Sequence, residues 1–173
     1  RAIRFKSSQI YIQKDIFLSC GLSTAILRRS PSDLTQKNGV MHKPYEITLG
    51  HPADFRVRYC YYLPEDGGRK IVPSQGIRSD FWYDFPNDNV KGMFMIWPEF
   101  EDENGNVILE GDVSVNRCGT ARMWIINPER RPEHIGKIKI GLKCYFMEGQ
   151  RKVAECEVVE LLSLNSNPVT SKK

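Results

Sequence analysis

The segment IGLKCYFMEGQRKVAECEVVEL, residues 140–161, indicates the fold class most clearly, because it predicts two antiparallel strands joined by a turn at 148–151. Apolar residues occupy alternate positions over 138–146, which is typical of a strand with one buried face. Beyond the turn the apolar positions change phase after Val158, since Val159 lies on the opposite face. Such a change of phase predicts a β-bulge near residue 158.

The same two-residue period recurs in the rest of the chain. Phe55, Val57 and Tyr59 alternate with charged residues, and Asn104-Gly105 is a strong signal for a hairpin turn. Several such strands without a long helix predict an all-β protein, a closed antiparallel barrel of six or seven strands, because closure hides strand edges. We expect three parts, namely an N-terminal extension of strands or an arm packed on the barrel (1–53), the barrel (54–162) and a flexible tail (163–173).

Composition bounds the class of protein. The 173 residues suit one domain, and 40% hydrophobic residues are enough for a core without a metal or a disulfide staple. No apolar run reaches about eighteen residues, so we expect no membrane span and a cytoplasmic location. The five cysteines, at positions 20, 60, 118, 144 and 156, form no CxxC pair and predict reduced, packed thiols. A bridge between Cys144 and Cys156 is the alternative.

No catalytic or ligand-binding motif stands out. The histidines at 42, 51 and 134 lack metal-ligand spacing with a cysteine or a carboxylate, so we expect no metal site. The sequence contains no nucleophile elbow and no phosphate-binding loop. A charged strand end beside a turn accounts for the acids at 99–103. We therefore expect no enzymatic activity, no cofactor and no bound nucleotide.

Positive charge is concentrated in residues 128–152. This segment holds seven lysines and arginines against three glutamates. Seven cations are enough to neutralise several phosphates of a nucleic acid, whereas a solvated face without a ligand is the alternative interpretation. The stretch 99–112 holds six carboxylates and no cation, and such an asymmetry orients a charged partner.

Glycine and arginine recur in two separated motifs, Gly67-Gly68-Arg69 with Gly76-Ile77-Arg78, and Gly141-Leu142-Lys143 with Glu148-Gly149-Gln150-Arg151. These two motifs resemble those of the third domain of elongation factor Tu, the C-terminal β-barrel of that translational GTPase. The family's closing motif, Gly-Leu-Arg followed by Glu-Gly-Gly-Arg and a last strand, is matched here by Gly141, Leu142, Lys143, Glu148, Gly149, Arg151 and Val153. Its opening motif, an acidic loop followed by Gly-Gly-Arg and Gly-Tyr-Arg, is matched by Leu63, Glu65, Asp66, Gly67, Gly68, Arg69, Gly76, Arg78 and Phe81. Gly111-Asp112 resembles the family's Pro-Gly-Asp turn, so the resemblance covers about residues 54–162.

The chain also departs from the family pattern. The tripeptide Pro-Ser-Gln at 73–75 stands where the family has Pro-Phe-Phe, and Gln150 replaces the second glycine of the last turn. Asn127 matches a lysine that lies, in the family, near the face that meets the T-stem of aminoacyl-tRNA. The family's nucleotide-binding domain has no counterpart, and residues 1–53 do not resemble its second barrel. The resemblance therefore implies a free-standing copy of the barrel rather than a working elongation factor.

The resemblance implies a non-catalytic module that binds a protein. The partner would be a component of the translation machinery, or a toxin that seizes elongation factor Tu, in which case this chain is an antidote-like decoy, an immunity protein. The alternative is an RNA- or tRNA-binding protein that uses the basic hairpin 137–152. The predicted partner- or RNA-binding residues are Arg69, Arg78, Arg130, Arg131, Lys139, Lys143, Arg151 and Lys152. The predicted structural turns lie at Gly67, Gly68, Gly105, Gly111 and Gly149.

Overall fold

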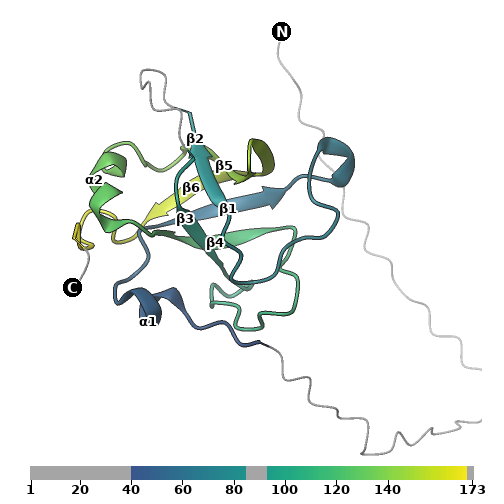
Figure 1. The fold of residues 1–173 in the computed structure, drawn as a ribbon, viewed down its shortest axis with the longest axis horizontal. Coiled ribbons are helices and arrows are strands. Elements are labelled where there is room, and N and C mark those ends of the chain that lie inside the picture. Colours follow the sequence, from purple (N-terminus) through teal and green to yellow (C-terminus); the bar gives the residue numbers. More distant parts are fainter. Residues whose placement is uncertain (1–39, 85–92, 171–173) are drawn as a thin grey trace, which may run out of the picture. The chain divides into compact units, whose positions relative to one another are not determined.

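A computed structural model of the protein describes residues 40–84 and 93–170. Their helices and strands are α1 (Tyr45–Leu49), β1 (Phe55–Tyr61), η2 (Pro64–Asp66), β2 (Asp80–Tyr83), β3 (Ile96–Phe100), β4 (Cys118–Ile125), η3 (Pro128–Arg130), α2 (Arg131–His134), β5 (Lys143–Glu148) and β6 (Arg151–Leu161). All six strands form one antiparallel sheet in the order β2-β5-β6-β1-β4-β3 (Figure 1). The mostly-β class is confirmed.

The sheet curls into an open half-barrel, so the predicted closed barrel is wrong. Among the residues that the structure describes, the edge strands β2 and β3 are joined where Phe81 exchanges two backbone hydrogen bonds, of 3.0 and 2.8 Å, with Phe94, just before β3. Further along β3, the buried Gln75 side chain takes the place of a strand: its Nε2 donates to the Phe100 carbonyl (3.1 Å), and the Phe100 N–H donates to its Oε1 (3.0 Å). Pro98, on the same edge by alternation, has no N–H to offer.

Two β-bulges bend β6. Arg56 lies opposite Glu160 and Val57 opposite Val158, so Val159 is the extra residue, which confirms the predicted bulge near 158. A second register shift, opposite Phe146 and Met147 of β5, leaves Val153 as another extra residue. Bulges increase local twist and bend a strand, and these two lie in the strand that pairs with both β1 and β5.

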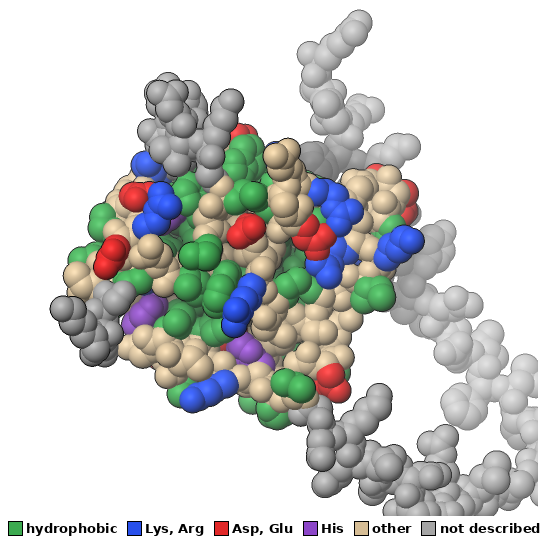
Figure 2. All heavy atoms as spheres, in the orientation of Figure 1, with side chains coloured by type: hydrophobic (Ala, Val, Ile, Leu, Met, Phe, Trp, Pro, Cys, Tyr) green, Lys and Arg blue, Asp and Glu red, His purple; other side chains and the backbone are tan. Residues whose placement is uncertain are grey.

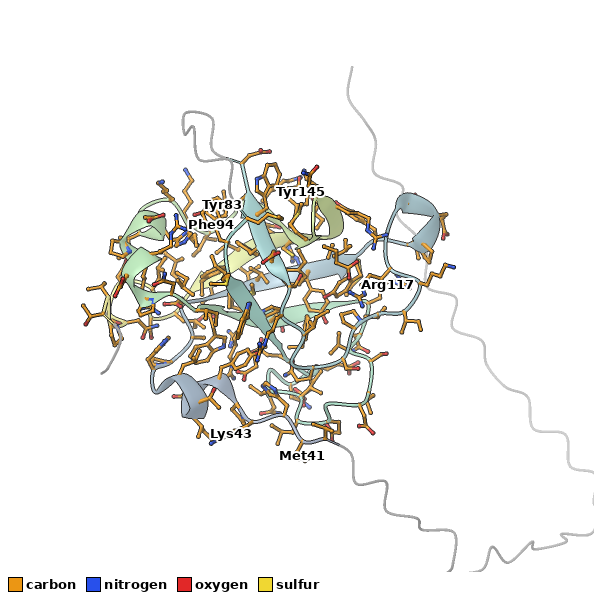
Figure 3. All side chains as sticks on the ribbon, in the orientation of Figure 1. Met41, Lys43, Tyr83, Phe94, Arg117 and Tyr145 are labelled. Carbon is orange, nitrogen blue, oxygen red and sulfur yellow. A yellow bond between two sulfur atoms is a disulfide. The ribbon has the colours of Figure 1, made fainter. Side chains whose placement is uncertain are left out.

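The core fills the inner face of the curled sheet with aromatic rings. Tyr59 packs edge-to-face on Phe100 with 5.1 Å between ring centroids. At the junction of β2 with the segment before β3, Tyr83 stacks on Phe94, with 5.1 Å between their ring centroids (Figure 3). Leu164, in the predicted tail, is buried with this core. Edge-to-face and offset ring pairs stabilise a core beyond the area they bury.

The cysteines divide into two cross-strand pairs. Cys60 of β1 and Cys118 of β4 lie directly opposite each other and form a disulfide, so the prediction of reduced thiols is wrong for this pair. Cys144 and Cys156 also lie opposite each other, on the inner face, and are buried and unbridged. Cys20 lies outside the described residues.

The predicted N-terminal extension is described from residue 40 onward; its residues 1–39 lie outside the described part. Segment 40–51 contacts β3 through the buried Glu99 carboxylate. Glu99 Oε1 lies 2.8 Å from Nε2 of His42 and accepts a 2.6 Å hydrogen bond from the backbone N–H of Tyr45. The short helix α1, which lies within this segment, buries none of its residues.

Candidate binding face

The outer face of the sheet, opposite the core, carries its side chains in rows that cross the strands. Trp82 of β2, Tyr145 of β5 and Glu155 of β6 are successive cross-strand neighbours. Glu155 lies opposite Cys60, which lies opposite Cys118, so this first row spans five strands. Cross-strand neighbours on one face are close enough to interact directly.

Two further rows on the outer face contain charged side chains of both signs. The second row contains Lys143, Glu157, Arg58 and Thr120, and the third contains Glu160, Arg56, Arg122 and Glu99. Arg58 pairs with Glu157 at 2.9 Å, and Arg122 Nε lies 2.8 Å from the buried Glu101. Because cations and carboxylates are neighbours in register, most of the charge on this face is balanced locally.

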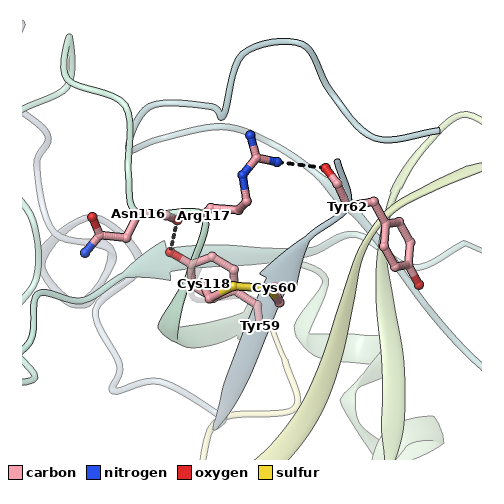
Figure 4. Close-up of a disulfide and its surroundings, with 6 residues drawn as sticks. All are labelled: Tyr59, Cys60, Tyr62, Asn116, Arg117 and Cys118. Carbon is pink, nitrogen blue, oxygen red and sulfur yellow. Dashed lines mark hydrogen bonds between the residues drawn. A yellow bond between two sulfur atoms is a disulfide. The ribbon is translucent and has the colours of Figure 1, made fainter. Parts of the chain in front are cut away.

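A groove of about 630 Å³ crosses the first two rows. The Cys60–Cys118 disulfide lines it (Figure 4). The lining also contains five carboxylate side chains and two cations, namely Glu101, Asp102, Glu103, Glu155, Glu157, Arg58 and Lys143. The acidic residues of the hairpin after β3 therefore meet the end of the basic hairpin here. Lys143 Nζ lies 3.4 Å from Glu155.

An aromatic platform, made of Trp82, Tyr145 and Lys152, adjoins the groove. The two rings lie 5.6 Å apart between centroids. The Lys152 Nζ is 4.3 Å from the centroid of Trp82 and 3.6 Å from that of Tyr145, within range of a cation–π contact with both. Tyr62 lies near this platform: burial first, and then the charges of Glu155 and Tyr145, raise the pKa of its hydroxyl.

The two glycine-marked turns of the sequence come together at one corner of the molecule. Arg69, after the first turn, forms an ion pair with Glu148, and Arg151, after the last turn, lies 2.5 Å from the same carboxylate. The turns themselves need positive φ, which is 85° at Gly67 and 56° at Gly149. A shallow pocket of about 520 Å³ lies between them.

The other predicted turns have different roles. Gly105 closes the predicted hairpin, where its N–H donates to the Asp102 carbonyl at 3.1 Å. At Gly68 a Cβ atom would lie 2.0 Å from the Tyr62 carbonyl oxygen, and at Gly111 it would lie 2.4 Å from that of Val40. Both positions need glycine because another backbone segment passes too close for a side chain.

Arg131 is the one predicted binding residue that the structure removes from the surface. Its side chain is fully buried, and its Nε donates a 2.7 Å hydrogen bond to the Asp54 carboxylate. The same carboxylate accepts hydrogen bonds of 2.8 Å from the backbone N–H of Ile125 and from Asn167 Nδ2. A buried guanidinium that satisfies a buried carboxylate cannot contact a partner, so the assignment of Arg131 to a binding surface is wrong.

The remaining predicted cations are spread over several surfaces. Arg78 lies over Trp97, with 4.8 Å from its Cζ to the ring centroid. Arg130 is exposed and lies 3.1 Å from Glu133. Lys139 is exposed near the start of β5. The structure therefore brings Lys143 and Lys152 to the outer face, and Arg69 and Arg151 to the corner, but does not gather all eight residues into one patch.

Sequence reasoning missed the disulfide and the aromatic platform. Alternation along β1 places Cys60 on the face opposite Tyr59 and Tyr61, which was a sign that it points away from the core. Neither the pairing of Cys60 with Cys118 nor that of Trp82 with Tyr145 follows from local pattern, because each depends on register between strands distant in sequence.

No family model matches this sequence, and no curated protein matches it. Among the described residues, no group of three or more metal-ligating side chains is close enough to hold an ion. Over the same part of the chain, no helix has the length and apolar character needed to cross a membrane.

Proposed function

We propose that this chain is a non-catalytic binding module, related to the third domain of elongation factor Tu, which engages a protein partner through the outer face of its sheet. Two features support the relationship. The described part is one antiparallel sheet curled around an aromatic core. The two motifs that carry the resemblance also meet in space, where Arg69 and Arg151 share Glu148.

The observation that favours a protein as the partner is that the predicted binding cations are mostly paired with carboxylates. Among the eight predicted binding cations, five lie in ion pairs with carboxylates, namely Arg69, Arg130, Arg131, Lys143 and Arg151. A phosphate backbone approaching the groove would also meet more carboxylates than cations. Protein surfaces carry both signs of charge, and on the face seen in Figure 2 basic and acidic side chains lie beside apolar ones.

The aromatic platform supplies the anchor that such an interface needs. Tryptophan and tyrosine are enriched among the residues that contribute most to protein–protein binding. Trp82 and Tyr145 are each partly exposed, and the Lys152 ammonium lies over both rings. Rings that are already ordered lose little conformational freedom on binding.

Affinity capture tests the proposal. The purified chain is immobilised, and proteins retained from a lysate of its source are compared with those retained by Trp82→Ala and by Ile140→Ala. Ile140 is 67% exposed and lies outside the platform, which makes it the matched control. We expect the alanine at 82 to lose the partner by more than about tenfold, as for a hot-spot residue, and the control to keep it. Equal capture by all three proteins contradicts this interface.

The captured protein is then used to test whether this chain and elongation factor Tu bind the same partner. The proposed partner is a translation component or a toxin that also binds elongation factor Tu, and free elongation factor Tu should compete with the chain for it. A partner that elongation factor Tu does not displace removes the decoy hypothesis, while leaving the binding module intact.

RNA binding is the second candidate, because Trp82 and Tyr145 beside Lys152 form a surface on which bases can stack. Filter retention of tRNA at increasing salt decides it, since binding to phosphates weakens steeply as salt rises. Lys143→Glu should weaken retention of all RNA sequences alike. Absence of salt-dependent retention excludes this candidate.

A further inference from the structure

The outer face contains an accessible disulfide, and the core contains a protected thiol pair. Cys60 and Cys118 are both exposed, and their bridge lines the groove. Cys144 and Cys156 are buried, with exposed fractions of 0% and 2%. Burial raises the pKa of the Cys156 thiol, which keeps it protonated and unreactive. External thiols can therefore reach only the first of these two pairs in the folded protein.

The strand ends around the bridge are also held by hydrogen bonds. The backbone N–H of Tyr61 donates to the Arg117 carbonyl at 2.9 Å. The Arg117 guanidinium donates to the Tyr62 carbonyl at 2.9 Å, and the Tyr59 hydroxyl donates to the Asn116 carbonyl at 3.0 Å (Figure 4). These three contacts keep β1 and β4 together when the S–S bond opens, so attack on the bridge does not require unfolding.

We propose that the Cys60–Cys118 bridge is a reversible thiol-exchange site. An external thiolate attacks Cys60 Sγ, the S–S bond breaks, and the electron pair leaves on Cys118 Sγ. A second external thiolate then displaces Cys60 from the mixed disulfide. Two external thiols are thereby oxidised to one disulfide, the protein bridge is reduced by two electrons, and the two protein thiolates take protons from water.

The direction of attack follows from the carboxylate that lies opposite one of the two sulfurs. Cys60 lies opposite Glu155, whose carboxylate disfavours a thiolate at that position. Cys118 is paired in register with Cys60 itself rather than with a carboxylate. A leaving thiolate departs faster where it is stabilised. Cys118 is therefore the leaving group, and the mixed disulfide forms on Cys60.

The groove also selects among thiols by charge. Three of its five carboxylates, Glu101, Glu155 and Glu157, lie in ion pairs, so the excess negative charge of the lining comes from Asp102 and Glu103. This excess attracts a cationic thiol and repels an anionic one. A cysteine within a basic peptide segment, or a small aminothiol, is the class of reactant that fits. The selection weakens at high salt because the charges of this open groove are screened.

The experiment uses the full chain with Cys20→Ser, so that the cysteine outside the described residues does not react. The folded protein is mixed with cysteamine or with reduced glutathione, quenched in acid, alkylated and measured by intact mass and peptide mapping. We expect mixed disulfide on Cys60, then alkylation of Cys60 and Cys118 alone, at a rate proportional to thiol concentration. Per thiolate, cysteamine should react about fivefold faster at low salt, and the ratio should approach one at high salt.

Other outcomes overturn the proposal. If the protein isolated under oxidising conditions lacks the Cys60–Cys118 bridge, the proposed exchange site does not exist. Labelling of all four described cysteines together, at a rate independent of thiol concentration, shows that exchange follows global unfolding. Equal rates for the two thiols at low salt contradict selection by the groove. If Cys20→Ser does not fold, peptide mapping of the unmodified chain gives the same comparison.

Discussion

The buried pair of Arg131 and Asp54 predicts a large difference between two neighbouring arginines. Arg131→Ala leaves the Asp54 carboxylate buried without its cation, and loss of one partner of a buried pair costs about 3–5 kcal/mol. Arg130 is exposed and its pair with Glu133 is a surface ion pair, so Arg130→Ala should cost at most about 1 kcal/mol. The two variants remove the same type of side chain from adjacent positions.

Urea unfolding followed by tryptophan fluorescence measures the difference. A domain of this size has a urea dependence of about 2 kcal/mol per molar, so a loss of about 4 kcal/mol lowers the midpoint by about 2 M. Arg130→Ala should lower it by less than about 0.5 M. The loss in Arg131→Ala should also persist in high salt, because a buried pair is poorly screened.

Equal midpoints for the two variants would contradict a stabilising role for the buried pair of Arg131 and Asp54. So would a loss in Arg131→Ala that disappears in high salt, since that is the behaviour of a surface charge. Folding stability is about 5–15 kcal/mol, so Arg131→Ala could leave the chain unfolded. In that case Arg131→Lys, which keeps the charge but loses the fixed geometry of the guanidinium, should fold with an intermediate midpoint.

Three further predictions concern stability. Cys60→Ser with Cys118→Ser opens a loop closed across a sequence separation of 58 and should lower the free energy of unfolding by about 4 kcal/mol; a loss below about 1 kcal/mol contradicts this. Burial lowers the pKa of His134 to about 4, so the unfolded chain gains a proton near pH 6.5 before the folded chain does. Stability should therefore fall by up to about 3 kcal/mol as pH is lowered from 7 to 4, and His134→Gln should flatten this slope in urea titrations. Gly68→Ala should lower the thermal midpoint through a clash with the Tyr62 carbonyl and cost about 1–3 kcal/mol; an unchanged midpoint shows that the loop moves freely.

The elements that sequence predicted well are those defined by local alternation. The period-two pattern located β1 at Phe55–Tyr61, and the change of phase located the bulge at Val159. The glycine motifs predicted turns, and the structure places Arg69 and Arg151 on one carboxylate. These features depend on residues within a few positions of each other. The exception is the meeting of Arg69 and Arg151, which are distant in sequence.

The predictions that failed depend on contacts between distant segments. Closure of the barrel was wrong because the Gln75 side chain bonds the edge of β3, and no local pattern shows which backbone a glutamine will meet. Arg131 resembled its exposed neighbour Arg130 in sequence, and its burial against Asp54 distinguishes the two in the structure. The disulfide likewise depends on the register that places Cys60 opposite Cys118. Resemblance to a barrel family did not supply these contacts.

The side-chain amide of Gln75 and the tertiary amide nitrogen of Pro98 have a consequence for how copies of this chain behave in a crowded solution. An unprotected sheet border is a template on which another molecule can add its own strand and begin a fibril. At the edge of β3, the backbone N–H of Phe100 already donates to Gln75, and Pro98 has no N–H to donate to an incoming strand. The β3 edge of the open sheet is therefore protected against the repeated addition of strands from other copies of the chain.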